Sequence, residues 1–167
     1  MRSGTLQVDP LPKASTLSDL LEQIGQALSE GWIELDLSDK GLVDLPVDIA
    51  KLTGLRSLDL RNNQLTSLPD SIAQLTGLQS LDLRGNQLTS LPDSFGQLTG
   101  LQSLYLDGNQ LTSLPDSFAQ LTGLKLLDLD GNQLTSPPPD IVAQGTNAIL
   151  TFLRERIKDG QRQWTSL

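Results

Sequence analysis

Leucines alternate with polar residues in short stretches that recur at a fixed distance along the chain. Each stretch begins the pattern L-x-x-L-x-L-x-x-N-x-L-x-x-L-P-x-x-I/F-x-x-L-x-x. Strict alternation is typical of a β-strand with one buried face. The proline in the second half favours an extended return path over a full helix. Each unit therefore predicts one strand followed by one irregular return segment.

The unit is 23 residues long and occurs five times between residues 32 and 146. The copies at 55–77 and 78–100 differ at four positions, and those at 78–100 and 101–123 at three. Copies this similar predict a solenoid whose neighbouring strands are parallel, about 4.8 Å apart. The end copies depart from the pattern, with Lys40 in place of Asn and Pro137-Pro138-Pro139 in place of Leu-Pro-Asp. Terminal repeats are expected to be atypical because each faces a cap.

Stacking predicts which side chains are buried. Two columns of leucines should fill the core, and one Ile or Phe in each copy should close the convex side. The Asn after each strand can both donate and accept hydrogen bonds, so a column of Asn can bridge successive turns. The leucine columns are Leu35, Leu58, Leu81, Leu104 and Leu127, and Leu37, Leu60, Leu83, Leu106 and Leu129.

Helical caps are predicted at both ends of the repeats. Residues 15–31 should form the first, with Ser15 or Thr16 as N-cap and Gly31 as the stop. Residues 147–160 should form the second, with Thr146 as its cap and Gly160 at its end. Residues 1–14 are expected to be a flexible leader, and residues 161–167 to be unstructured. The predicted apolar faces are Leu17, Leu20, Leu21, Ile24 and Leu28, and Ile149, Leu150, Phe152, Leu153 and Ile157.

Composition narrows the function. The chain has 167 residues, no cysteine, no histidine and a formal net charge of −8. It therefore lacks disulfides, thiolate metal sites and any Ser-His-Asp triad. Its negative charge disfavours nucleic acid, and no apolar run is long enough for a membrane span or a signal peptide. We expect a cytoplasmic, non-enzymatic protein with no cofactor, metal or small-molecule substrate.

The pattern across residues 32–146 resembles the leucine-rich-repeat family. That resemblance implies an α/β solenoid, a right-handed horseshoe whose strands line the concave face, and a role in protein–protein interaction. The segment P-P-P-D-I-V-A-Q-G-T-N-A-I-L-T-F-L-R-E-R resembles the end of the repeat domain in bacterial Roco proteins and related cyanobacterial repeat proteins. In Roco proteins this helix leads into a Ras-like GTPase domain and a dimerisation domain. No phosphate-binding loop of the form G-x-x-x-x-G-K-[ST] occurs here.

Two contexts for the repeats remain open. The chain is either a free-standing interaction module or a regulatory fragment of a larger Roco-like GTPase, whose partner is then another domain of the same polypeptide. As a fragment it is expected to be a monomer. The near-identity of the copies is compatible with recent duplication and with a consensus design.

The candidate binding surface is the outward side of the concave sheet. Arg61 and Arg84 can offset neighbouring carboxylates in the second and third copies, whereas the fourth and fifth copies are acidic. Tyr105 is the one departure from Asp in its column, and tyrosine is enriched at binding hot spots. We predict a basic or polar partner around Tyr105. The candidate residues are Asp36, Asp59, Arg61, Asp82, Arg84, Tyr105, Asp107, Asp128 and Asp130.

These residues also allow other interpretations. The Asp and Ser residues could simply keep an exposed sheet soluble. A flat ladder of Asp offers too few converging oxygens for calcium, and an open sheet has no cleft to raise the pKa of a glycosidase acid. The basic residues of the second helix could lie on a membrane, but its apolar face is needed to close the solenoid. The concave face covers roughly 400 Å², so a tight partner must also contact a rim or cap.

Overall fold

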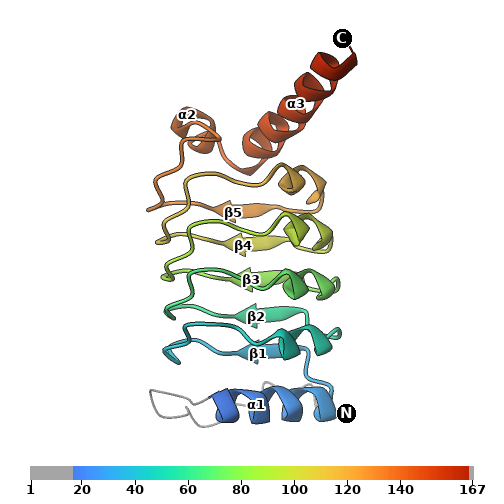
Figure 1. Ribbon diagram of the computed structural model, residues 1–167, viewed down its shortest axis with the longest axis vertical. Helices are drawn as coiled ribbons and strands as arrows, with labels where there is room; N and C mark the ends of the chain where they lie inside the picture. Colours follow the sequence, from blue (N-terminus) through green and yellow to red (C-terminus); the bar gives the residue numbers. More distant parts are fainter. Residues whose placement is uncertain (1–16, 166–167) are drawn as a thin grey trace.

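The computed structural model describes residues 17–165, which form a stack of repeats with a helix at each end (Figure 1). We call each repeat with its strand a rung, numbered 1 to 5 along the chain. The five strands form one sheet in the order β1-β2-β3-β4-β5, and every neighbouring pair is parallel. The predicted α/β solenoid with five copies is confirmed. The strands are β1 Glu34–Asp36, β2 Ser57–Asp59, β3 Ser80–Asp82, β4 Ser103–Tyr105 and β5 Leu126–Asp128.

Strand register places the predicted leucine columns in the core. Leu35 pairs with Leu58, Leu58 with Leu81, and the same register continues to Leu127. Every leucine of the two predicted columns is at most 8% exposed. Because the side-chain period of a strand is two, this register turns the intervening polar residues to the opposite face.

The return path of each rung is less irregular than predicted. After the Leu-Pro pair the chain is extended at proline, with φ −66° and ψ 146° at Pro69. A short 3₁₀ helix then begins, because the proline carbonyl accepts the N–H three residues on, as in the 3.0 Å bond from Ile72 N to Pro69 O. The proline thus delays helical structure by one residue and does not prevent it. These helices are η1 Val47–Lys51, η2 Asp70–Gln74, η3 Asp93–Gln97 and η4 Asp116–Gln120; rung 5 has α2 Pro139–Val142.

Aromatic packing makes rungs 3 and 4 different on this convex side. The rings of Phe95 and Phe118 stack with their centroids 5.3 Å apart. Gly96 follows Phe95, and a Cβ there would lie 2.4 Å from the backbone oxygen of Ser117 in the next rung. Rungs 2 and 4 have Ala73 and Ala119 at the same place. The single Gly-for-Ala difference is therefore required by a close approach of two backbones.

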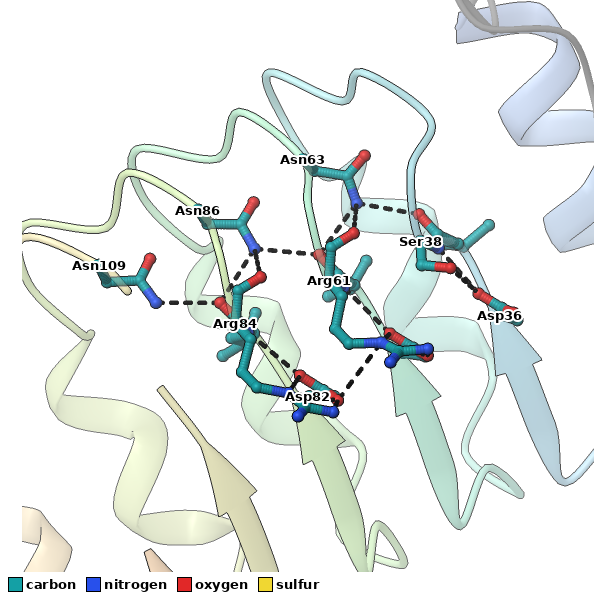
Figure 2. A network of polar contacts seen from close by, with 12 residues as sticks. Asp36, Ser38, Arg61, Asn63, Asp82, Arg84, Asn86 and Asn109 are labelled. Atoms are coloured by element: carbon teal, nitrogen blue, oxygen red, sulfur yellow. Dashed lines mark hydrogen bonds and ion pairs between the residues drawn. The ribbon is translucent and has the colours of Figure 1, made fainter. Parts of the chain in front are cut away.

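The asparagine column bonds in one direction along the stack (Figure 2). Asn86 Oδ1 accepts from Leu65 N at 3.2 Å, and its Nδ2 donates to Leu60 O and Leu83 O, both at 3.0 Å. Asn63, Asn109 and Asn132 repeat the pattern, each bonding to its own rung and to the rung before. Rung 1 has no rung before it, which explains why Lys40 replaces Asn there.

The N-terminal cap is α1, Leu17–Glu30. It ends at Gly31, φ 65°, where Gly31 N bonds to Leu28 O and Trp32 N to Ala27 O. This is the Schellman arrangement that glycine favours. The predicted N-cap at Ser15 or Thr16 and the leader 1–14 lie outside the described residues.

The predicted buried face of α1 was wrong in part. Leu20 and Ile24 are buried together with Gln23 and Ala27, whereas Leu17, Leu21 and Leu28 stay exposed. The flat end of the stack contacts only one narrow stripe of the helix. The three exposed leucines belong to the next stripe, which faces away from the repeats.

The C-terminal cap is α3, Thr146–Thr165, which extends outward from the stack (Figure 1). Ile149, Leu150 and Leu153 cover the last rung, while Phe152 and Ile157 are partly buried, as the pattern predicts. The predicted stop at Gly160 and the unstructured end at 161–167 were wrong as far as Thr165. A single glycine inside a helix lowers its stability by only about 1 kcal/mol and does not end it.

Two polar contacts tie α3 to the stack. Thr146 Oγ1 accepts from Leu127 N at 3.0 Å, so this hydroxyl bonds to β5 and does not cap the helix as predicted. Arg156 bonds to Asp116 Oδ1 and to Ser136 Oγ, at 2.9 and 2.6 Å. Arg156 thus contacts rungs 4 and 5. Nowhere in residues 17–165 is a helix both long and apolar enough to cross a lipid bilayer.

Candidate functional site

In each rung, the outward side chains of the strand and the side chain two positions beyond its last residue lie on the same side. Together they form a continuous surface across the five rungs, which we call the sheet face. Register aligns five of the predicted residues in one column, with Tyr105 between two aspartates. The structure therefore brings the candidates together on one side of the stack. The column is Asp36, Asp59, Asp82, Tyr105 and Asp128.

The aspartates of this column have a structural role that the sequence analysis did not foresee. In four rungs the Asp Oδ1 accepts the backbone N–H two residues on. These bonds are 2.9 to 3.1 Å long and fix the turn that ends each strand. Tyrosine has no carboxylate, so rung 4 lacks this bond. Tyr105 thus replaces a turn-stabilising residue.

Arginines in rungs 2 and 3 fold back onto these carboxylates. Arg61 bonds to Asp59 through Nε at 3.0 Å and also reaches Asp82 Oδ2 in the next rung at 3.5 Å. Arg84 bonds to Asp82 through Nε at 3.0 Å and through its terminal nitrogen at 2.6 Å (Figure 2). Hydrogen bonding to Asp59 and Asp82 raises the pKa of each guanidinium above its ordinary value. In these rungs the charged groups of the sheet face are paired with one another.

Rung 4 is built differently. The Arg84 guanidinium lies over the Tyr105 ring, 4.8 Å from its centroid, in the geometry of a cation–π contact. Asp107 stands where rungs 2 and 3 have arginine, and its Oδ1 is buried without a hydrogen-bond partner. Burial raises the pKa of Asp107, and the negative charges of Asp128 and Asp82 add to this, while a hydrogen bond to its own backbone and Arg84 oppose it. Rung 4 therefore combines a half-buried aromatic ring with a poorly satisfied carboxylate.

Leu126 is a member of this surface that the candidate residues omitted. It pairs with Ser103 in the register, diagonal to Tyr105, and is 42% exposed. Its column otherwise holds Glu34, Ser57, Ser80 and Ser103, so the departure from a polar residue is the signal that could have found it. Tyr105 and Leu126 together give rungs 4 and 5 an apolar centre beside Asp107, Asp128 and Asp130.

Within residues 17–165, the features outside the sheet face make weaker candidate sites. No group of three or more acidic residues within that range is arranged to hold a metal ion. A pocket of about 550 Å³ lies between η4 and α3, away from the sheet face, and is lined by Asp93, Asp116, Ser117 and Arg156 among others. Arg156 is already bonded to Asp116 there. The sheet face is the better candidate, because its departures from the repeat include the exposed Leu126, the half-buried Tyr105 and the carboxylate of Asp107, which has an unpaired oxygen.

Comparison with known protein families supports the assignment of the fold. A model described as a leucine-rich repeat region matches residues 35–155. The chain belongs to the leucine-rich-repeat family. Domains of this family generally mediate protein–protein interaction. None of the curated proteins matches the chain.

Solved structures of leucine-rich-repeat proteins are similar to part of the chain. A protein of Leptospira interrogans is 43% identical with a TM-score of 0.59, covering 62% of this chain and 26% of its own. A chain of the BIR3–SERK2 complex from Arabidopsis thaliana is 35% identical with a TM-score of 0.54, covering 60% and 56%. The BIR2 ectodomain of the same plant is 27% identical with a TM-score of 0.54, covering 62% and 69%. The matched region is thus about a quarter of the Leptospira protein and just over half of the complex chain.

Proposed function

We propose that this leucine-rich-repeat domain binds a protein partner through the sheet face of rungs 3 to 5, with Tyr105 at the centre. The partner presents a basic side chain beside an apolar one. The observation that carries this proposal is the change at rung 4. There, two adjacent outward positions replace the internally paired Asp and Arg of rung 3 with Tyr105 and Asp107.

Rung 4 lacks two stabilising interactions that rung 3 makes. Tyr105 forgoes the turn bond that Asp makes in the other rungs, and Asp107 lacks the ion pair that Arg84 makes. Residues that break a local rule without a compensating gain are expected at functional positions. Tyr105 and Leu126 offer apolar contact, and the carboxylates of Asp128 and Asp130 lie beside them for a cation.

The small area of the sheet face limits how a partner can bind. The sheet face spans roughly 400 Å², about half of what a stable interface buries on each side. A partner that binds tightly must therefore also contact a rim or a cap. One that binds the sheet face alone is either weak or held at high effective concentration within the same polypeptide.

The experiment compares partners captured by the wild-type chain and by a double variant, Tyr105→Asp with Asp107→Arg. This variant gives rung 4 the sheet-face residues that rung 3 already accommodates. A matched control, Asp36→Asn, changes the sheet face at the other end. Captured proteins are quantified by mass spectrometry.

The proposal expects at least one protein that the wild type and Asp36→Asn retain and the double variant loses at least tenfold. Direct titration of that protein then gives its affinity for each variant. Equal capture by all three chains would refute a binding site at rung 4.

The C-terminal segment favours a second candidate function, in which the repeats regulate a further domain of the same polypeptide. Its α3 is a continuous helix, anchored by Arg156 to rungs 4 and 5 and directed away from the stack (Figure 1). This suits a rigid connection to a further domain, as in the Roco-like GTPases that the segment resembles, and a partner within the same chain. Reading the gene beyond Leu167 tests this, because a phosphate-binding loop should follow α3. The absence of cysteine supports a cytoplasmic location in either context.

A further inference from the structure

The fifth rung has backbone groups without partners at the outer edge of the stack. In the described part of the chain, no acceptor is bonded to Leu129 N, Gly131 N or Leu134 N, and no donor to Leu134 O. Leu129 is 4% exposed as a whole residue, whereas Gly131 is exposed and Leu134 is partly buried. Binding of a partner that supplies the missing hydrogen bonds to such unpaired groups is favourable.

The inner rungs show which groups would complete this edge. Gly108 N bonds to Asp130 O at 2.8 Å, and Leu111 N to Asn132 Oδ1 at 2.9 Å. Leu111 O accepts from Gln133 N at 3.2 Å. Leu106 N likewise bonds to Asp128 O at 2.9 Å. The edge of rung 5 therefore fits an extended segment that offers carbonyl oxygens to Leu129 N and Gly131 N and, two residues after the second of these, an Asn followed by a free backbone N–H.

The C-terminal cap seals only one part of this edge. Thr146 Oγ1 takes the place of a sixth strand at Leu127 N. Farther along the rung, Leu134, Ile141 and Val142 are only partly buried, whereas Leu111 and Phe118, the residues of rung 4 that match Leu134 and Ile141, are fully buried. Apolar surface therefore lies beside the unpaired backbone groups.

Charge on the sheet side of this edge selects the incoming segment. Asp128 and Asp130 form no ion pair with any described residue. Within the stack, Arg84 of rung 3 and Asp107 of rung 4 occupy neighbouring positions of the column that ends at Asp130, and their opposite charges attract each other. A segment aligned with rung 5 would place its own basic residue beside Asp130.

We propose that rung 5 accepts an extended segment of a protein partner along the turn that follows β5, beyond the part sealed by Thr146: the segment has a basic residue opposite Asp130 and an Asn two residues after it. This edge adjoins the sheet face of rungs 3 to 5 and shares Asp130 with it, but it does not include Tyr105. It adds a rim contact of the kind that the small sheet face requires.

The chain itself supplies matched probes. A synthetic peptide of residues 55–65 carries Arg61 and Asn63 at the required spacing, whereas residues 101–111 carry Asp107 and Asn109 at the same places. Each is titrated into the full chain while amide signals and amide exchange are recorded by NMR. We expect the 55–65 peptide to slow exchange at Leu129, Gly131 and Leu134 at least tenfold, with the equivalent amides of rungs 2 and 3 unchanged. The 101–111 peptide should bind at least tenfold more weakly.

Two variants test the site. Val142→Glu places a charge beside the open edge and should weaken binding of the 55–65 peptide at least tenfold. Val47→Glu, an equally apolar but 66% exposed position in rung 1, should leave it unchanged. An Asn63→Ala peptide should lose protection at Leu134 first.

Three results would overturn the inference. One is no protection at the three amides, and another is equal binding of the two peptides. The third is protection that rises with protein concentration without peptide, which would assign the edge to pairing between copies. None of these results depends on Tyr105, so the edge can fail while the proposed sheet-face function holds.

Discussion

Rungs 3 and 4 share a scaffold and differ at three positions, Asp82/Tyr105, Arg84/Asp107 and Gly96/Ala119. Their leucines are equally buried, and Asn86 and Asn109 make the same bonds. On the sheet face, however, rung 3 satisfies its own charges, whereas rung 4 leaves a carboxylate oxygen unpaired beside an aromatic ring. The repeat therefore specifies the scaffold, and the proposed binding site falls on positions of rung 4 that lack the stabilising contacts of rung 3.

Replacing the buried asparagines should have the largest effect on the free energy of unfolding. It tests whether rungs 3 and 4 have the same scaffold. Asn86→Ala and Asn109→Ala each remove one hydrogen-bond acceptor and two donated bonds. The buried backbone groups left without partners each cost about 1–3 kcal/mol of stability. We expect each variant to lose about 3 kcal/mol or more of the free energy of unfolding, measured with urea. Asn132→Ala, in the less buried fifth rung, serves as control and should lose less. Clearly unequal losses at Asn86 and Asn109 would break the comparison.

On the convex side, substitutions at equivalent positions of rungs 3 and 4 should change the free energy of unfolding by different amounts. Gly96→Ala puts a Cβ against Ser117 O, which should lower the free energy of unfolding by about 2 kcal/mol through overpacking. The reverse change, Ala119→Gly, creates no clash and should cost under about 1 kcal/mol. Thermal unfolding of both variants checks this. Similar losses would show that the close approach at Gly96 is not what separates the rungs.

On the sheet face, the carboxylates of Asp82 in rung 3 and Asp107 in rung 4 should contribute differently to stability. Asp82→Ala removes a turn bond and an ion pair, and should cost about 1–2 kcal/mol. Asp107→Ala removes a carboxylate with an unpaired oxygen, so stability should stay level or rise slightly. Urea unfolding at neutral pH measures both. A larger loss for Asp107→Ala than for Asp82→Ala would contradict the account.

The smallest effect is a dependence on pH. Burial raises the folded-state pKa of Asp107 above 3.8, so the folded chain binds this proton more tightly than the unfolded chain. Stability contributed by protonated Asp107 is therefore present below 3.8 and is lost as pH rises through the folded pKa. The stability of wild type relative to Asp107→Asn should fall across that window. A difference that stays constant with pH, or rises, would show that Asp107 is not desolvated in the fold.

Much of the scaffold could be predicted from the sequence because its signals are local and repeated. The leucine columns, the parallel strands and the Asn bridges follow from the period alone. Two details could not be predicted this way. The stripe of α1 that packs depends on the shape of the stack end, and Gly160 does not end α3 because one glycine is a weak breaker.

The sheet face was harder to predict for a physical reason. The column of Asp suggested free surface charge, yet all four of its carboxylates bond to the backbone N–H two residues on. That bond depends on the turn geometry after each strand, which periodicity does not reveal. Tyr105 was recognisable as the exception in its column. Leu126 carried the same kind of signal but was passed over, because one exposed leucine is ordinary on a protein surface.

The most direct test of the central claim is the free energy of unfolding of the double variant Tyr105→Asp with Asp107→Arg. This change gives rung 4 the turn bond and the ion pair of rung 3. The account predicts a gain of about 1 kcal/mol over wild type, because rung 4 has given up these interactions. A loss of stability would contradict it, since Tyr105 and Asp107 would then be the residues that the scaffold itself requires.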